Sequence, residues 1–295
     1  MAAEIMNRVR YVFLTVALLT GGAAVLTAQS KPAAPPAGPK VAVPAVAPLD
    51  NKGGGELDLT KFPGQIIDEV IVPVPSEIFT VLDKLGDPDW KAEVGVTPKP
   101  SFNERTDVAL LLGATVADGF IAVQAEDKKS VQEVGKNVLS LAQALSVKDD
   151  VLRHCQAIDD AANASKWDVV RSELDATQAT VRGKMQQMQD GALAECISVG
   201  GWLRGTQVIT AVIGKSFSAE RAELLYQPDL AEYFNDALEE MLVKAKNPAK
   251  LKLIADGLAR VRELMDNGGG DITAAAVAEM NTVTAGLVKK ITVKP

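Results

Sequence analysis

Histidine and cysteine are scarce in this sequence. Its 295 residues include one histidine, His154, and two cysteines, Cys155 and Cys196. A structural zinc site needs four Cys or His ligands, and adjacent side chains such as His154 and Cys155 point in different directions on a helix. We therefore expect no metal site and no cofactor, and the sequence assigns no catalytic residue.

Aromatic residues make up only 4% of the chain, although 47% of it is hydrophobic. A core poor in aromatics must be built from Ala, Val, Leu and Ile, which suits close-packed helices better than a β-sandwich. The predicted fold class is therefore all-α, a multi-helix bundle or an irregular array of about eight or nine helices in helical hairpins. A short extended, Pro-rich N-terminal region is expected to precede the helices.

Basic residues are outnumbered, with 31 Lys and Arg against 38 Asp and Glu, which gives a formal net charge of −7. An acidic surface repels phosphate backbones, and proteins that bind nucleic acid normally neutralise those phosphates with clustered Lys and Arg. We therefore expect no nucleic-acid partner.

Residues 1–28 have the layout of a secretory signal. Arg8 and Arg10 precede an apolar run over residues 11–26, which ends in small residues. An uncleaved membrane anchor is the alternative, because the run approaches the roughly 20 residues that a spanning helix needs. The sequence therefore predicts a bacterial periplasmic or secreted protein, or else one anchored in the inner membrane through residues 1–28 and facing the periplasm.

Residues 29–56 are rich in proline, alanine and glycine, and include the sequence KPAAPPAGPKVAVPAVAPLD. Such segments favour extended polyproline conformations and act as semi-rigid spacers. We interpret them as a linker between the signal segment and one helical globular domain over residues 57–295.

Beyond residue 105, apolar residues recur every three or four positions, which places them on one face of a helix. Three such stripes are Val131, Val134, Val138, Leu141 and Leu145; Trp167, Val170, Leu174, Val181, Met185 and Met188; and Leu251, Ile254, Leu258, Val261 and Met265. Each of these predicted helices must pack against a neighbour.

Several residues are typical of helix ends. Ser76 is a candidate N-cap, Ser165 followed by Asp168 resembles a capping box, and Asn247 before a proline fits another N-cap. Pro228 is expected to divide the stretch 218–246 into two helices.

Two long apolar segments each have a charged residue near the middle. Asp118 lies within residues 106–126, and Arg204 lies within residues 191–214, two positions after Trp202. Charged groups in apolar surroundings are costly unless they have partners. One hypothesis is therefore that Asp118, Trp202 and Arg204 line a pocket for a small polar ligand.

The alternative is an ion pair that serves only the fold. Asp118 or Glu195 would then pair with Arg204 to satisfy a buried charge. A core helix covered on all sides also explains the apolar composition of residues 106–126 without a membrane.

Export would make a disulfide between Cys155 and Cys196 feasible, because extracytoplasmic compartments are oxidising. Two buried thiols that behave as small hydrophobic side chains explain the same residues equally well.

No motif in the chain has the spacing of a known catalytic site, so the sequence favours a function other than catalysis. The predicted function is a non-enzymatic binding or scaffolding module of the cell envelope, with another envelope protein or a small polar ligand as its partner. Two alternatives are an enzyme with a dispersed site around Asp118 and Arg204, and a membrane-anchored assembly factor.

Overall fold

The computed structural model describes residues 65–67, 70–72, 75–95, 104–245 and 248–293. The chain divides into two units, Met1–Glu56 and Leu57–Pro295, and every described residue belongs to the second. The predicted signal segment and linker therefore lie outside the described residues. Apart from one pair of three-residue strands, the described part is helical, which confirms the all-α fold class predicted from composition and periodicity.

Nine helices of ten or more residues dominate the described part, in agreement with the predicted number. They are α2 (Pro75–Lys84), α4 (Arg105–Gln124), α5 (Lys128–Ala144), α6 (Lys148–Asn163), α7 (Trp167–Gln187), α8 (Gly191–Lys215), α10 (Pro228–Lys244), α11 (Ala249–Asp266) and α12 (Ala274–Thr292). The helices α3 (Trp90–Glu93) and α9 (Ala219–Ala222) are single turns. The strands β1 (Gln65–Ile67) and β2 (Val70–Val72) form an antiparallel pair with Ile66 opposite Ile71.

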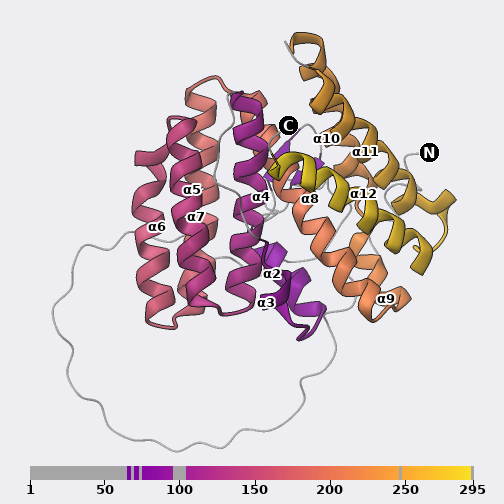
Figure 1. Ribbon diagram of the computed structural model, residues 1–295, viewed down its shortest axis with the longest axis horizontal. Coiled ribbons are helices and arrows are strands. Elements are labelled where there is room, and N and C mark those ends of the chain that lie inside the picture. Colours follow the sequence, from indigo (N-terminus) through magenta and orange to yellow (C-terminus); the bar gives the residue numbers. More distant parts are fainter. Residues whose placement is uncertain (1–64, 68–69, 73–74, 96–103, 246–247, 294–295) are drawn as a thin grey trace, which may run out of the picture. The chain divides into compact units, whose positions relative to one another are not determined.

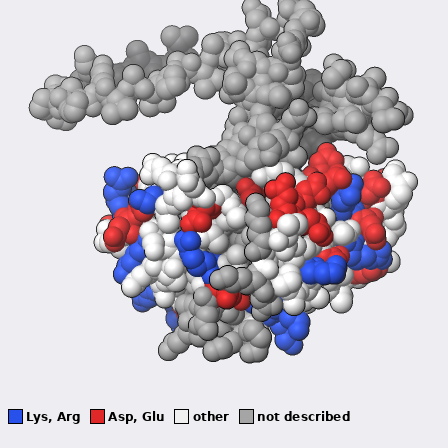
Figure 2. Space-filling model, turned by 90° about the horizontal axis from the view of Figure 1, so that it is seen from above, with Lys and Arg blue, Asp and Glu red and all other residues white. Residues whose placement is uncertain are grey.

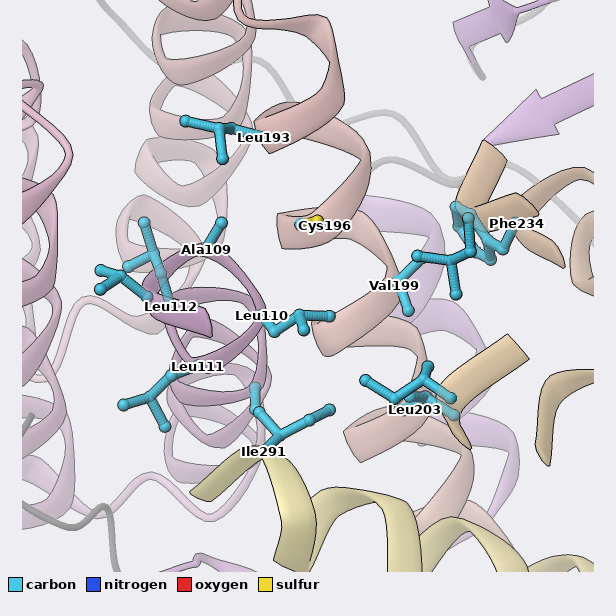
Figure 3. Close-up of a cluster of buried hydrophobic side chains, with 14 of the residues drawn as sticks. Ala109, Leu110, Leu111, Leu112, Leu193, Cys196, Val199, Leu203, Phe234 and Ile291 are labelled. Atoms are coloured by element: carbon cyan, nitrogen blue, oxygen red, sulfur yellow. The ribbon is translucent and has the colours of Figure 1, made fainter. Parts of the chain in front are cut away.

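The helices α4 and α8 cross so closely that their backbones touch. A Cβ atom added to Gly113 of α4 would lie 1.9 Å from the carbonyl oxygen of Ile197, and one added to Gly200 of α8 would lie 2.0 Å from that of Leu110. Only glycine allows this approach. Figure 3 shows the leucines of α4 and the apolar side chains of α8 that surround the crossing and form one core.

Both crossing helices are long and apolar enough to span a membrane, by length and composition alone. Within their apolar windows, 78% of the residues of α4 and 56% of those of α8 are buried inside the protein. Core helices that neighbours cover on several sides have this same composition. Burial of this extent therefore favours the interpretation of α4 as a core helix.

The helices α5, α6 and α7 lie side by side as one layer (Figure 1). Similar turns join the helices from α4 to α8, each with a non-glycine residue in the left-handed conformation: Glu126, Ser146, Ser165 and Gln189. The amide of the following residue closes each turn, for example from Lys166 to the carbonyl oxygen of Ala161 at 2.9 Å. This is the bond of a Schellman motif, which ends a helix.

These turns correct one predicted helix start. Ser165 belongs to the end of α6 rather than to a capping box before α7, because its positive φ of 56° is that of a C-terminal turn. Ser76 also does not precede its helix, since α2 already begins at Pro75, a residue well suited to the first helical position. Pro228 does begin α10, as predicted, and Asn247 lies outside the described residues.

The layer is attached to the core unevenly. Its first helix, α5, packs along α4, and α6 packs between α5 and α7. In contrast, α7 meets α8 at few positions. On the other side of α8 lie α12 and the hairpin of α10 and α11 (Figure 1). A hollow therefore remains between the layer and the pair α4 and α8.

Candidate functional site

The hollow is a cavity of about 740 Å³ lined by α2, α4, α5, α6, α7 and α8, with α10 at one side. Its volume lies within the roughly 300–1,000 Å³ that is usual for small-molecule sites. Apolar side chains form most of its wall, among them Val116, Val138, Leu174, Val181 and Ile197. The cavity is thus large enough and apolar enough to hold a ligand.

Two helical glycines open onto the cavity. Gly135 of α5 and Gly205 of α8 both line the cavity, and a Cβ atom added to either would have no other atom within 4 Å. Gly135 lies on the same face of α5 as Val131 and Val138, so the space that its side chain would occupy is part of the cavity. A sequence signal for the cavity therefore existed, namely a glycine in the middle of an apolar stripe.

Trp202 forms part of the cavity wall. Its Nε1 donates a hydrogen bond to Oε1 of Gln227 at 3.0 Å, and its ring meets that of Phe234 edge to face with the centroids 6.0 Å apart. The polar atom of the indole is therefore satisfied within the protein, while the ring lines the cavity.

The short helix α2 covers one end of the cavity, with Ile78, Val81 and Leu82 among the lining residues. Arg171 of α7 holds it in place. Its guanidinium donates to Asp83 at 3.2 Å and lies 4.4 Å from the centre of the Phe79 ring. This clasp combines an ion pair with a cation–π contact.

Asp118 and Arg204 form a buried ion pair away from Trp202. The Arg204 atoms Nε and Nη2 each lie 2.8 Å from Oδ1 of Asp118, and both side chains are less than one tenth exposed. The amide of Gly95 donates to the same carboxylate at 3.0 Å. Burial raises the pKa of Asp118, and the neighbouring guanidinium opposes that rise.

The remaining donors of Arg204 also point at protein atoms. Nη1 donates to Oε1 of Gln207 at 2.9 Å, and Nη2 donates to the carbonyl oxygen of Glu93. The pair therefore ties the end of α3 to α4 and α8. A hollow of about 400 Å³ adjoins it, but the geometry accounts for both charges without a ligand. Of the three predicted residues, the structure brings Asp118 and Arg204 together and places Trp202 at the apolar cavity.

Both cysteines are free thiols in the structure. Cys196 is fully buried in the core shown in Figure 3, with its Sγ 4.0 Å from Sδ of Met241. Cys155 is partly buried and lines the cavity. Burial raises the pKa of Cys155 to about 11 and that of Cys196 to about 12.

We expect alkylation of these thiols to depend on unfolding. A thiolate is the reactive form, so at pH 8 the folded protein should react with iodoacetamide far more slowly than the denatured protein. In denaturant without a reductant, mass spectrometry should find both Cys155 and Cys196 labelled. Labelling that appears only after reduction would instead demonstrate a disulfide.

His154 is buried between α6 and α7. Its Nδ1 lies 3.0 Å from Oε2 of Glu173, and its Nε2 lies 2.9 Å from Oγ1 of Thr180. These contacts use both ring nitrogens to join the two helices. Within the described ranges, no group of three His, Cys, Asp or Glu side chains is arranged to hold a metal ion.

The structural evidence for a site is therefore the apolar cavity, together with the polar residues at its border. Comparison with known proteins adds no assignment. No family model, no curated protein and no solved structure matches the chain.

Proposed function

We propose that this protein is a non-enzymatic binding module of the cell envelope that holds an apolar small molecule between the α5–α7 layer and the helices α4 and α8. The observation that carries this proposal is the cavity of about 740 Å³, whose wall is mostly apolar. Buried apolar surface is the main source of affinity in such sites, while a few polar groups orient the ligand.

The size of the cavity supports a ligand on energetic grounds. Apolar side chains that border a hollow lack packing partners on one side and lose the dispersion contacts that a filled core provides. A hollow of about 740 Å³ leaves a large apolar wall in this condition. A ligand that fills the hollow would replace the missing apolar contacts.

The composition of the wall favours binding over catalysis. Three lining residues are charged, Glu77, Lys136 and Asp159, and they come from three different helices. Acid–base catalysis needs groups placed together around a reacting atom. A predominantly apolar wall removes water from an apolar ligand and provides a surface that fits it, which is what a carrier protein needs.

The proposed location rests on the sequence of residues 1–28, and the surface charge bears on the partner. An export signal there places the domain in the periplasm or outside the cell, and an uncleaved segment would anchor it in the inner membrane. Acidic side chains gather over part of the face that Figure 2 shows, and such a surface repels nucleic acid.

A single substitution should test the proposal. Gly205→Leu extends a side chain from α8 into the cavity, where an added Cβ meets no atom within 4 Å. We expect the variant to bind the uncharged fluorescent probe N-phenyl-1-naphthylamine at least about tenfold more weakly than the original protein, a loss of about 1.4 kcal/mol. Its melting temperature should not fall, because leucine favours a helix more than glycine does.

Gly286→Leu is the matched control. Gly286 lies in α12, is exposed, and has no atom within 4 Å of an added Cβ. This variant should bind the probe as the original protein does. Absence of probe binding to the original protein would overturn the proposed function, and so would equal binding by the Gly205→Leu variant.

A further inference from the structure

The lining of the cavity extends along two of its helices. Its lining residues on α8 run from Ala194 to Ile209, and those on α5 run from Val131 to Ala142. At 1.5 Å per residue these stretches measure about 22 Å and about 16 Å. A lining that continues this far along α5 and α8 can contact an extended molecule along its length.

An acyl chain has these dimensions. The hydrocarbon core of a bilayer is about 30 Å thick, so the chain of one leaflet extends about 15 Å. Branched and aromatic side chains from facing helices, such as Val138 of α5 and Trp202 of α8, line the length of the hollow. They provide apolar contact along the whole of an extended chain.

The border of the cavity has a polar part on α5 and α6. Lys136 and Gln156 are the exposed residues of the described lining, which indicates where the cavity reaches solvent. Gln132 of α5 donates to Asn163 of α6 at 3.2 Å. In antiparallel helices, that contact places Lys136, one turn further along α5, level with Asp159.

Asp159 provides an acceptor at this position. Its Oδ1 is buried and has no hydrogen-bond partner in the part of the chain that the structure describes. A buried acceptor without a donor costs about 1–3 kcal/mol. A rotation of the Asp159 side chain toward the cavity would let a ligand hydroxyl donate to this oxygen and would remove that cost. The same hydroxyl could accept a hydrogen bond from the Lys136 ammonium.

The charges around the cavity disfavour an anionic ligand. Two of its three charged lining residues, Glu77 and Asp159, are acidic, and the chain has a net charge of −7. A free carboxylate at the border would therefore be repelled more than it is attracted. An uncharged end is the better match.

From these observations we infer that the ligand is a lipid with one extended acyl chain and an uncharged, hydroxyl-bearing end, such as a monoacylglycerol, with the chain between α5 and α8 and the hydroxyl at Asp159. This inference rests on the proposed function and specifies its ligand.

Displacement of N-phenyl-1-naphthylamine tests the class of ligand. We expect 1-monoacylglycerols to displace the probe with an affinity that rises about fourfold per methylene up to a limiting chain length, because each buried methylene contributes a constant increment. Monolaurin should displace it at a lower concentration than laurate of equal chain length, and cholesterol should displace it poorly.

Two variants locate the ligand. Gly135→Leu fills the cavity from α5, a different helix from that of Gly205, and should weaken the binding of monolaurin at least about tenfold. Gly286→Leu should leave that binding unchanged. Asp159→Leu should weaken the binding of monolaurin. It should leave the binding of methyl laurate unchanged, because methyl laurate has no hydroxyl to donate.

The outcomes separate the inference from the proposed function. If the original protein fails to bind the probe, the proposed function itself falls. If the probe binds and Gly205→Leu blocks it, but affinity is independent of chain length or cholesterol is the better competitor, the acyl-chain inference is wrong. Equal displacement by laurate and monolaurin, or no effect of Asp159→Leu, would overturn the assignment of the polar end.

Discussion

Gly113→Ala is expected to prevent stable folding. The new Cβ would lie 1.9 Å from the carbonyl oxygen of Ile197 and 2.7 Å from the amide nitrogen of Gly201, both backbone atoms of α8. Overpacking by a flexible side chain typically costs 1–3 kcal/mol, but backbone atoms cannot rotate away, so we expect more than about 3 kcal/mol. Gly200→Ala should have the same effect, because its Cβ would lie 2.0 Å from the carbonyl oxygen of Leu110.

Urea unfolding followed by circular dichroism measures this effect. The matched control is Gly201→Ala, one residue further along α8, where the added Cβ lies 3.4 Å from the carbonyl oxygen of Gly113 and is in ordinary contact. This control should be close to neutral, because alanine also has the higher helix propensity. A Gly113→Ala protein as stable as the control would show that α4 and α8 do not cross in this way.

Arg204→Met is expected to destabilise the protein by about 3–5 kcal/mol, because it leaves the Asp118 carboxylate buried without its ion partner. The sign of the pH dependence follows from the pKa. Burial already raises the pKa of Asp118 above its ordinary value of 3.8, so the folded protein holds that proton more tightly than the unfolded chain does. The destabilisation by the unpaired Asp118 carboxylate is therefore absent below pH 3.8. It grows as the pH rises above 3.8 and through the pKa of Asp118 in the folded protein.

The same unfolding measurement at pH 7 and at pH 4 tests this prediction. Arg204→Met should lose more stability at pH 7, and adding Asp118→Leu should restore much of it by removing the unpaired charge. Arg260→Met serves as a control, because Arg260 pairs with Glu263 and Glu279 at an exposed surface and should have little effect. An Arg204→Met protein as stable as the original protein would mean that the Asp118 carboxylate is solvated.

Much of the fold was predictable because helices are local structures. The stripe from Val131 to Leu145 does face the protein interior, since Val131, Val134, Leu141 and Leu145 are buried and Val138 lines the cavity. Pro228 begins a helix where its missing amide is harmless. The helix start predicted at Ser165 was wrong because serine is common both at helix starts and in tight turns. Only the backbone conformation distinguishes the two.

The candidate site was only partly predictable, since it depends on which helices face each other. Asp118 and Arg204 are 86 positions apart in the chain, and their isolation in apolar segments correctly suggested that they pair. Trp202 lies two residues from Arg204, yet it lines a different hollow, because successive side chains on a helix diverge by about 100°.

The amino-acid sequence by itself determined that this protein is helical, which faces of its helices are apolar, and that its two isolated interior charges needed partners. The tertiary structure alone decided how far apart those faces lie. A glycine in an apolar stripe brings two helices into contact at Gly113 and leaves a cavity at Gly205. In both cases the sequence shows only a glycine among apolar residues, and the position of the opposing backbone distinguishes the two.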